Sequence, residues 1–392
     1  MPDVLLLALL VVAIATGWWL GRRERRHRGT GPAPPALARD YFVGLNYLLN
    51  DQQDQAIETF IGALEVNSDT VETHLALGNL FRNRSEADRA LKIHQNLLAR
   101  PTLTADQSER VQLELSRDFL ALGLLDRAER LLEGLVRDAQ DDELRASARR
   151  LLIDLLERER EWQAALDVAL PKMVRQHDDI RRAAAHWLCE LAEQERHSAS
   201  PVLARRHLRQ ALATDARCVR ANLLLAAMAH DTGQYKQAIK LLRRIPDQDP
   251  AYTPLMLEPL AHAYRLLDDE EGLVHGLREL LDQAPSTAVI ALLAETLHHQ
   301  GQEQEALALI REQLERRPSL DAIHQLLTLS RRQARAADDH IELLERHTLA
   351  LVRARPRHRC RRCGFATETL HWQCPRCRNW GTMQPIDAPG EG

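Results

Sequence analysis

Residues 204–250 read ARRHLRQALATDARCVRANLLLAAMAHDTGQYKQAIKLLRRIPDQDP, and the same order of small and large residues occurs twice within them. The first run begins at Ala204 and the second at Ala238, 34 residues later. Both place apolar residues at helical spacing, as in Ala204, Leu208, Ala211 and again in Ala238, Leu242, Ile245. Pro250 closes the second run, at a point where a helix must end. The stretch therefore predicts helical hairpins that repeat with a fixed period.

The same period extends beyond this stretch in both directions. Gly272 and Ala306 continue the register, and Ala56 and Ala90 are also 34 residues apart. This pattern resembles the tetratricopeptide repeat, a helix hairpin of about 34 residues with a small residue where its helices cross. The resemblance implies an all-α solenoid of about eight or nine hairpins over residues 37–352. An irregular helical bundle is the alternative, and the regular spacing disfavours it.

A stacked array of this kind predicts a concave groove that binds peptides or other proteins. The array contains neither a phosphate-binding glycine loop nor a dinucleotide-binding glycine motif. It also lacks the serine motif of α/β-hydrolases and the paired histidines of zinc proteases. We therefore predict a binding protein and not an enzyme. Alternating charges, as in Glu157-Arg158-Glu159-Arg160, are expected to form solvated helix faces with weak ion pairs.

The N-terminal segment Val4–Leu20 (VLLLALLVVAIATGWWL) contains no charged residue. At about 1.5 Å per residue it reaches roughly 25 Å, near the lower limit for a helix that spans a bilayer. Five arginines follow within residues 21–28, where a signal peptide would have a small-residue cleavage site. We predict an uncleaved transmembrane anchor at residues 1–20, with the following chain in the cytoplasm. A cleaved signal peptide is the alternative.

Residues 21–36 are predicted to be a basic juxtamembrane segment and linker. Its arginines are expected to hold the topology and to contact anionic lipid, rather than to bind nucleic acid.

Four cysteines near the C-terminus form two Cys-x2-Cys pairs, Cys360 with Cys363 and Cys374 with Cys377. Each pair can turn two thiolates onto one centre, so the four sulfurs offer a tetrahedral set of soft ligands. We predict one Zn or Fe ion, with zinc favoured. Because four sulfurs close the coordination shell, the predicted role of the ion is structural rather than catalytic.

The remaining two of the six cysteines, Cys189 and Cys218, fall within apolar helical patterns. We predict that they are ordinary thiols of the core, which agrees with a reducing cytoplasm.

Residues 353–392 are predicted to form a metal-binding domain that is too small to bury a self-sufficient core. Metal binding is therefore expected to supply much of its folding free energy, with Phe365, Trp372 and Trp380 packed around the sulfurs. The two cysteine motifs resemble rubredoxin knuckles, in which backbone N–H groups bond the thiolates. The loop between the knuckles is short and Arg378 replaces a glycine after the last ligand, which argues against electron transfer.

The charges divide unevenly along the chain, whose net charge is −4. Residues 353–378 carry eight arginines and one glutamate, whereas the array before them has an excess of acidic residues. We predict that the basic C-terminal domain docks on the acidic array, over its last repeats. Exposed ion pairs are individually weak, so apolar contacts are also expected, with Trp380 and Ile386 as the candidates.

The order of these parts resembles the lipopolysaccharide assembly protein B family of Gram-negative bacteria over essentially the full chain. The anchor and the four cysteine ligands carry the resemblance most specifically. It implies a non-enzymatic, single-pass protein of the bacterial inner membrane with most of its chain in the cytoplasm. It also implies that the protein helps the membrane protease FtsH to degrade the lipid A biosynthetic deacetylase LpxC, which limits lipopolysaccharide synthesis.

The function expected from this resemblance is that of a membrane-tethered protease adaptor. Its expected partners are an FtsH-type membrane protease, an LpxC-type deacetylase, other lipopolysaccharide assembly proteins and inner-membrane lipid, with no nucleic acid among them. Two alternatives stay open. One is a scaffold that assembles lipopolysaccharide biosynthesis enzymes at the membrane, and the other is a rubredoxin-type electron carrier fused to a scaffold.

Overall fold

The structure is a computed structural model, and it describes most of the chain after residue 70. The described ranges are 71–197, 200–283, 286–316, 318–333 and 339–386, with six isolated positions between residues 43 and 59. The predicted anchor (1–20) and basic segment (21–36) lie outside these ranges. Among the helices that are described, none is both long enough and apolar enough to cross a membrane.

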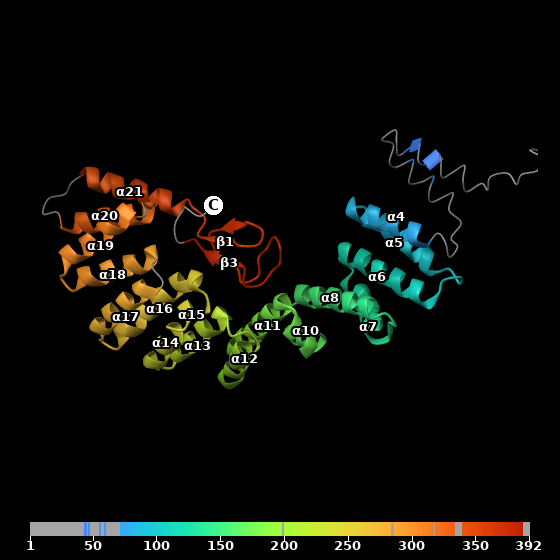
Figure 1. The fold of residues 1–392 in the computed structure, drawn as a ribbon, viewed down its shortest axis with the longest axis horizontal. Coiled ribbons are helices and arrows are strands. Elements are labelled where there is room, and N and C mark those ends of the chain that lie inside the picture. Colours follow the sequence, from blue (N-terminus) through green and yellow to red (C-terminus); the bar gives the residue numbers. More distant parts are fainter. Residues whose placement is uncertain are drawn as a thin grey trace, which may run out of the picture. The chain divides into compact units, whose positions relative to one another are not determined.

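Helices account for nearly all of the described chain up to Arg353, and three short strands follow (Figure 1). The elements are α4 (Val71–Asn83), α5 (Ala87–Leu98), α6 (Ala105–Ala121), α7 (Leu125–Asp138), α8 (Asp142–Glu159), α9 (Trp162–Val168), α10 (Pro171–Gln176), α11 (Asp178–His197), α12 (Pro201–Thr214), α13 (Val219–Asp231), α14 (Tyr235–Leu242), α15 (Ile245–Gln248), the 3-10 turn η2 (Pro250–Tyr252), α16 (Thr253–Leu266), α17 (Glu270–Gln283), α18 (Thr287–His299), α19 (Glu303–Arg316), α20 (Leu320–Gln333), α21 (Asp339–Arg353), β1 (His358–Cys360), β2 (Ala366–Thr367) and β3 (Met383–Pro385).

The small residues of the 34-residue register are buried in the second helix of their hairpins. Ala90, Ala204, Ala238 and Ala306 expose at most 1% of their surface. A methyl side chain at these points lets neighbouring helices approach closely. The predicted all-α array of tetratricopeptide type is therefore confirmed for the described residues, while Ala56 lies outside them.

The turn inside each hairpin repeats as well. Gly123, Gly233 and Gly301 follow α6, α13 and α18, and each has a positive φ, between 71° and 78°. Ser85 and Asp268 adopt the same left-handed conformation after α4 and α16, although they carry side chains that disfavour it. A residue in the left-handed conformation thus recurs between the first and second helices of these hairpins, where the chain reverses direction. The repeat is therefore visible in the backbone and not only in the sequence.

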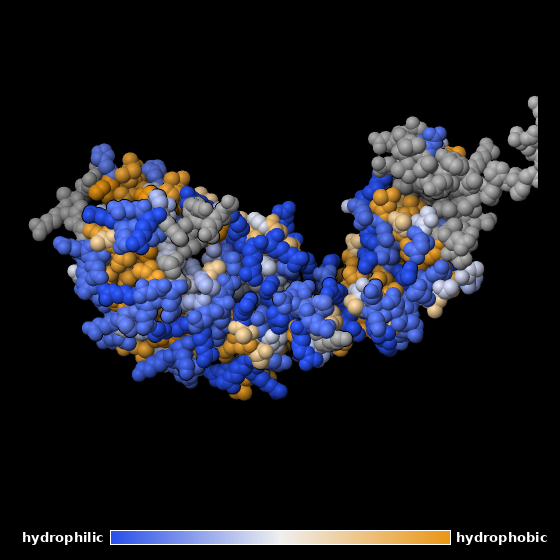
Figure 2. Space-filling view, viewed as in Figure 1, coloured by the Kyte–Doolittle hydropathy of each residue, from blue (hydrophilic) through white to orange (hydrophobic). Residues whose placement is uncertain are grey.

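The chain divides into two compact units within α8, residues 1–155 and 156–392. On the face seen in Figure 2, hydrophilic residues cover most of the described surface, with apolar residues exposed between them. This agrees with the prediction that the charged helix faces are mainly solvated.

A buried polar cluster that no sequence pattern predicted joins α4, α5 and α6 in the first unit. Asp118 accepts a hydrogen bond of 2.7 Å from Arg82 Nη1, and its other oxygen bonds Nδ1 of His94. The ring of His94 fills the space beside Gly78, where an added Cβ would lie 2.2 Å from Nε2. Gly78 is therefore required for α4 to pack this closely on α5.

In the second unit, the apolar core runs from α11 to α20 through buried side chains of successive helices. Cys189 and Cys218 are buried within it, as predicted, with their sulfur atoms 3.8 Å apart. Cys218 precedes the first turn of α13 rather than lying inside a helix. The chain ends in a three-stranded antiparallel sheet of order β2-β1-β3, which pairs Cys360 with Met383.

Candidate metal centre

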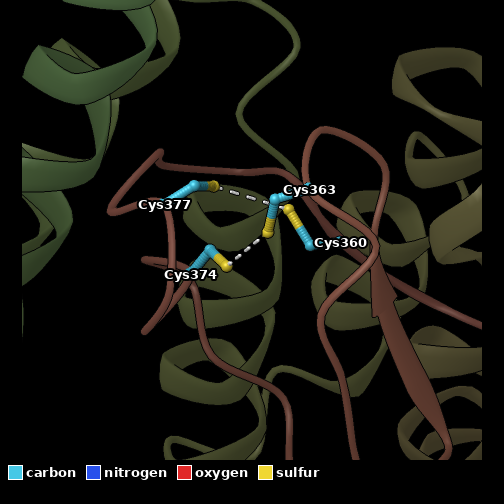
Figure 3. A group of neighbouring side chains, drawn as sticks. All are labelled: Cys360, Cys363, Cys374 and Cys377. Atoms are coloured by element: carbon cyan, nitrogen blue, oxygen red, sulfur yellow. Dashed lines mark hydrogen bonds between the residues drawn. The ribbon is translucent and has the colours of Figure 1, made fainter. Parts of the chain in front are cut away.

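The four predicted ligands converge on one point. Figure 3 shows the sulfur atoms of both knuckles facing one another. Cys360 and Cys377 have their Sγ atoms 3.7 Å apart, and those of Cys363 and Cys374 are 3.6 Å apart. A tetrahedral ion with metal–sulfur bonds of about 2.3 Å requires sulfur–sulfur edges of about 3.8 Å. The four cysteines therefore form a metal-binding tetrathiolate site, with each short edge joining the two knuckles.

Backbone and hydroxyl donors surround the sulfurs. Cys360 receives hydrogen bonds from the backbone N–H groups of Arg362 and Cys363, and the Thr382 hydroxyl lies 3.3 Å from its sulfur. Burial, the largest single influence, raises the pKa of Cys360, but these donors outweigh it and lower the pKa to about 6. The predicted rubredoxin-like bonding of thiolates by N–H groups is thus present in the first knuckle.

The second knuckle repeats this arrangement around Cys374, whose sulfur accepts from the N–H groups of Arg376 and Cys377. Cys374 has no exposed surface, and burial raises the pKa of its thiol to about 12. Metal coordination overrides this effect, because a coordinated thiol is deprotonated outright.

A residue with positive φ follows the last cysteine of each knuckle. Gly364 has a φ of 73° and Arg378 a φ of 54°. The N–H groups of these residues bond the carbonyl oxygens of Cys360 and Cys374, at 2.9 and 2.8 Å. Arg378 thus adopts the conformation of the glycine it replaces, and the departure from the rubredoxin pattern leaves the knuckle geometry intact.

The core of the metal-binding domain is small. Cys360, Cys374 and Met383 are its buried members, and Phe365 and Leu370 pack against them. The prediction for Phe365 is confirmed. The prediction that Trp372 and Trp380 pack around the sulfurs is wrong, because both indoles contact the helical array instead.

The carboxylate of Glu157, near the end of α8, connects the array to the metal-binding domain. Its Oε1 accepts hydrogen bonds from the indole N–H groups of Trp187 on α11 and Trp380, at 2.7 and 2.6 Å. Its Oε2 accepts from Gln373 at 3.2 Å. Glu157 was expected on a solvated helix face, and this expectation is wrong: it is partly buried and satisfies three donors.

Aromatic rings form the rest of this contact. His186 on α11 stacks on Trp380 with ring centroids 5.3 Å apart and also lies 5.6 Å from Trp372. Trp162 on α9 meets Trp380 edge-on at 5.8 Å. Burial, followed by the positive charges of Arg220 and Arg182, holds the pKa of His186 well below 6.5. His186 is therefore a neutral ring in an aromatic cluster.

A second group of contacts surrounds η2. The buried hydroxyl of Tyr252 donates to the carbonyl oxygen of Met383 at 2.8 Å, and its ring stacks on Trp372. Burial raises the pKa of Tyr252 above its ordinary value. Asp249 accepts from Gln384 at 3.2 Å and lies 3.7 Å from Arg361. This ion pair is the part of the docking that charge alone predicted.

Docking itself is thus confirmed, but its predicted place over the last repeats is wrong. The domain contacts Glu157 at the end of α8 together with α9, α11 and η2, all of which precede the last repeats. Figure 1 shows β1 and β3 near α11. The prediction for Trp380 is confirmed, whereas Ile386 is half-buried and its N–H bonds Arg357 within the domain. The sequence contains one sign of this contact, because tryptophan is rare in the chain and four of its six tryptophans lie here. They are Trp162, Trp187, Trp372 and Trp380.

Comparison with known protein families agrees with both parts of the chain. A family described as rubredoxin metal binding domain matches residues 358–385, and the tetratricopeptide repeat family matches residues 198–257. Among solved structures, a tetratricopeptide repeat protein from Parabacteroides merdae aligns with 72% of this chain and all of its own, at 12% identity and a TM-score of 0.34. Yeast Tom70 aligns with 80% of this chain and 84% of its own, at 14% identity and a TM-score of 0.30.

Relatives from two genera match almost the whole chain. Lipopolysaccharide assembly protein B of Escherichia coli strain K12 is 35% identical over 386 residues, which cover 97% of this chain and 98% of the relative. The protein of the same name from Haemophilus influenzae is 34% identical over 394 residues, with the same shares covered. With this identity along nearly its full length, and with the repeat array and tetrathiolate module in place, the chain belongs to the lipopolysaccharide assembly protein B family.

Proposed function

We propose that this protein is an inner-membrane regulator of lipopolysaccharide biosynthesis that acts as a non-enzymatic protease adaptor. In this proposal it presents an LpxC-type deacetylase to an FtsH-type membrane protease. The observation that carries the proposal is its membership of the family over 97% of the chain. The name of its relatives places them in lipopolysaccharide assembly, and the adaptor step is our inference.

The metal centre supports a structural role. Four sulfur ligands complete a tetrahedral shell, which leaves no position for water or substrate. The surrounding domain contacts α8, α9, α11 and η2 through hydrogen bonds and aromatic rings. We propose zinc as the ion because a closed tetrathiolate site of this kind suits Zn²⁺ and needs no redox change. Iron in the isolated protein would favour the electron-carrier alternative.

Confinement at the membrane gives such an adaptor its effect. A helix at residues 1–20 would hold the array near a membrane protease, so a captured substrate would meet the protease at a raised effective concentration without any new contact. Other lipopolysaccharide assembly proteins and inner-membrane lipid are further proposed partners. Nucleic acid is not among them.

The test is the half-life of the deacetylase after translation is stopped. We expect a longer half-life in cells depleted of this protein, and rescue by the full chain but not by a chain lacking residues 1–20. The shortened chain should still fold and bind metal, because the removed residues precede the array and the metal-binding domain.

A scaffold that gathers biosynthetic enzymes is the second candidate, and the word assembly in the name of the relatives favours it. The two candidates predict different results. An unchanged half-life of the deacetylase in depleted cells would reject the adaptor and support the scaffold.

A further inference from the structure

A pocket of about 680 Å³ lies in the second unit, among α9, α10, α11 and α12. Its volume falls within the range of about 300–1,000 Å³ that is typical of small-molecule sites. Neither the metal-binding domain nor the contacts of Glu157 take part in its lining. The short helix α10, which begins at Pro171, and the longer helix α12 both contribute residues to its lining.

Positive charge predominates around this pocket. Arg175 on α10, Arg181 on α11 and Arg206 on α12 all line it, against a single carboxylate, that of Asp167. Arg181 pairs with Asp178 at 2.8 Å. Arg175 and Arg206 have no carboxylate within ion-pair distance in the described part of the chain.

His207, next to Arg206, adds a further polar group to the lining. Its Nδ1 is buried and has no hydrogen-bond partner among the described atoms. Three arginines and a histidine from three helices thus surround one concave space, and guanidinium groups are the side chains best suited to bind phosphate or carboxylate oxygens.

Apolar side chains make up much of the remaining lining, with Leu166, Val174, Ala184 and Leu188 among them. Gln163, Gln210 and Thr214 add uncharged polar groups. The apolar surface continues outward along α12, where Val202 and Leu203 are 75% and 43% exposed. These two residues precede Arg206 and His207 by one helical turn, so they share a face of the helix with them.

A ligand that satisfies both surfaces needs an anionic head and an apolar chain. We propose that this pocket binds a small amphiphilic anion, with a phosphate or carboxylate head between Arg175 and Arg206 and its chain on the apolar lining. A wholly apolar ligand would leave Arg175 and Arg206 without an anionic partner, and an inorganic anion would leave the apolar lining uncovered. The site is independent of the adaptor function proposed above.

Binding can be tested with octyl phosphate as the probe and the full chain held in phosphatidylcholine nanodiscs. We expect octyl phosphate to slow amide hydrogen exchange in peptides from α10 and α12, and to bind at least about tenfold more tightly than inorganic phosphate or octylphosphocholine. Equal affinity for inorganic phosphate would overturn the proposal of an amphiphile, because the apolar lining would then be unused. Protection produced only by phosphatidylglycerol in the nanodisc, and not by the soluble probe, would also overturn it.

Matched variants locate the site. Arg206→Glu should weaken octyl phosphate binding about tenfold or more, whereas Arg209→Glu should leave it within about twofold, because Arg209 is exposed like Arg206 but does not line the pocket. Ala213→Trp places an indole in the pocket and keeps every arginine, so it should also abolish binding. Unchanged metal content and helicity verify that each variant is folded. Equal effects of the Arg206 and Arg209 substitutions would reject the site.

Discussion

The indole N–H of Trp380 donates a hydrogen bond of 2.6 Å to Glu157, which joins residues 223 positions apart in the chain. The same carboxylate oxygen accepts from Trp187, a residue of the array itself. Glu157 therefore belongs both to the packing of α8 on α11 and to the docking of the metal-binding domain. Substitution of Glu157 should therefore weaken both the packing of α8 on α11 and the docking of the metal-binding domain.

We expect Glu157→Ala to release the metal-binding domain from the array. Three donors lose their acceptor, and an unsatisfied buried donor costs about 1–3 kcal/mol. NMR relaxation should show the domain tumbling independently while it retains its metal. Glu159→Ala, two positions later on the same helix, is the control and should leave the domain docked. Loss of docking in both variants would mean that α8 itself has been disturbed.

The metal ligands could be predicted from sequence because a Cys-x2-Cys pair is a local motif. Its spacing alone turns two sulfurs the same way, and the turn after each pair forms even where Arg378 replaces glycine. The repeat array could be predicted because small and large residues recur every 34 residues, and a recurring pattern predicts the same helix hairpin in each repeat.

The docking site could not be predicted in the same way. Glu157 carries the pattern of a solvated helix face, and its partners Gln373 and Trp380 are more than two hundred positions away. The opposite charges of the C-terminal domain and the array predicted that the two dock. Charge alone does not specify which helices the domain contacts. The ring of His186 stacks on Trp380 and contacts Trp372 at a tilt, and no local sequence pattern encodes this contact.

Gly381→Ala should weaken docking more than Gly364→Ala. Both glycines have a positive φ, so both substitutions strain the backbone. Only at Gly381 would the new Cβ also meet α11, 2.9 Å from His186 Nε2 and 3.0 Å from Arg182 Cδ, whereas nothing lies within 4 Å at Gly364. The extra cost of overpacking is about 1–3 kcal/mol. Limited proteolysis of the segment before β1 measures docking, and equal cleavage of the two variants would contradict the prediction.

Docking should weaken as the pH falls below about 6.5, the ordinary pKa of histidine. The docked form holds the pKa of His186 well below that value, through burial first and then Arg220 and Arg182. On release His186 loses the burial that lowers its pKa most, so the undocked form binds protons more readily than the docked form and gains population as pH falls. Above this window the contribution of His186 to docking is fully present.

His186→Phe is the matched variant for this pH dependence, because it keeps an aromatic ring and removes the titration. Its docking should depend less on pH than that of the natural chain. Metal content must be measured at each pH, since protonation of the cysteines would also release the domain. Identical pH profiles for the two proteins, with metal retained, would exclude His186 as the titrating group.

Arg378→Val should destabilise the metal-binding domain by about 1–2 kcal/mol relative to Arg378→Gly, because a β-branched residue fits poorly in the left-handed region. Both variants lack the guanidinium group, so their difference reports the backbone conformation at φ 54° alone. The measurement is the chelator concentration that removes half of the metal, which should be lower for the valine variant. Equal values would mean that the second knuckle relaxes out of this conformation.

Cys374→Ser should release the metal ion and, as a consequence, undock the whole C-terminal domain. Cys374 is fully buried, and its sulfur lies 3.6 Å from that of Cys363 on the other knuckle. A hydroxyl is a poor ligand for an ion that prefers thiolates, and the few buried residues of this domain cannot hold it folded without metal. Elemental analysis should find about one ion per natural chain and none in the variant, while circular dichroism of the helices changes little. Cys218→Ser is the control, since this buried thiol lies outside the site and its loss should leave the metal bound. If the Cys374 variant kept its metal, or lost it while the domain stayed docked, the ion would not be what positions the tryptophans on the array.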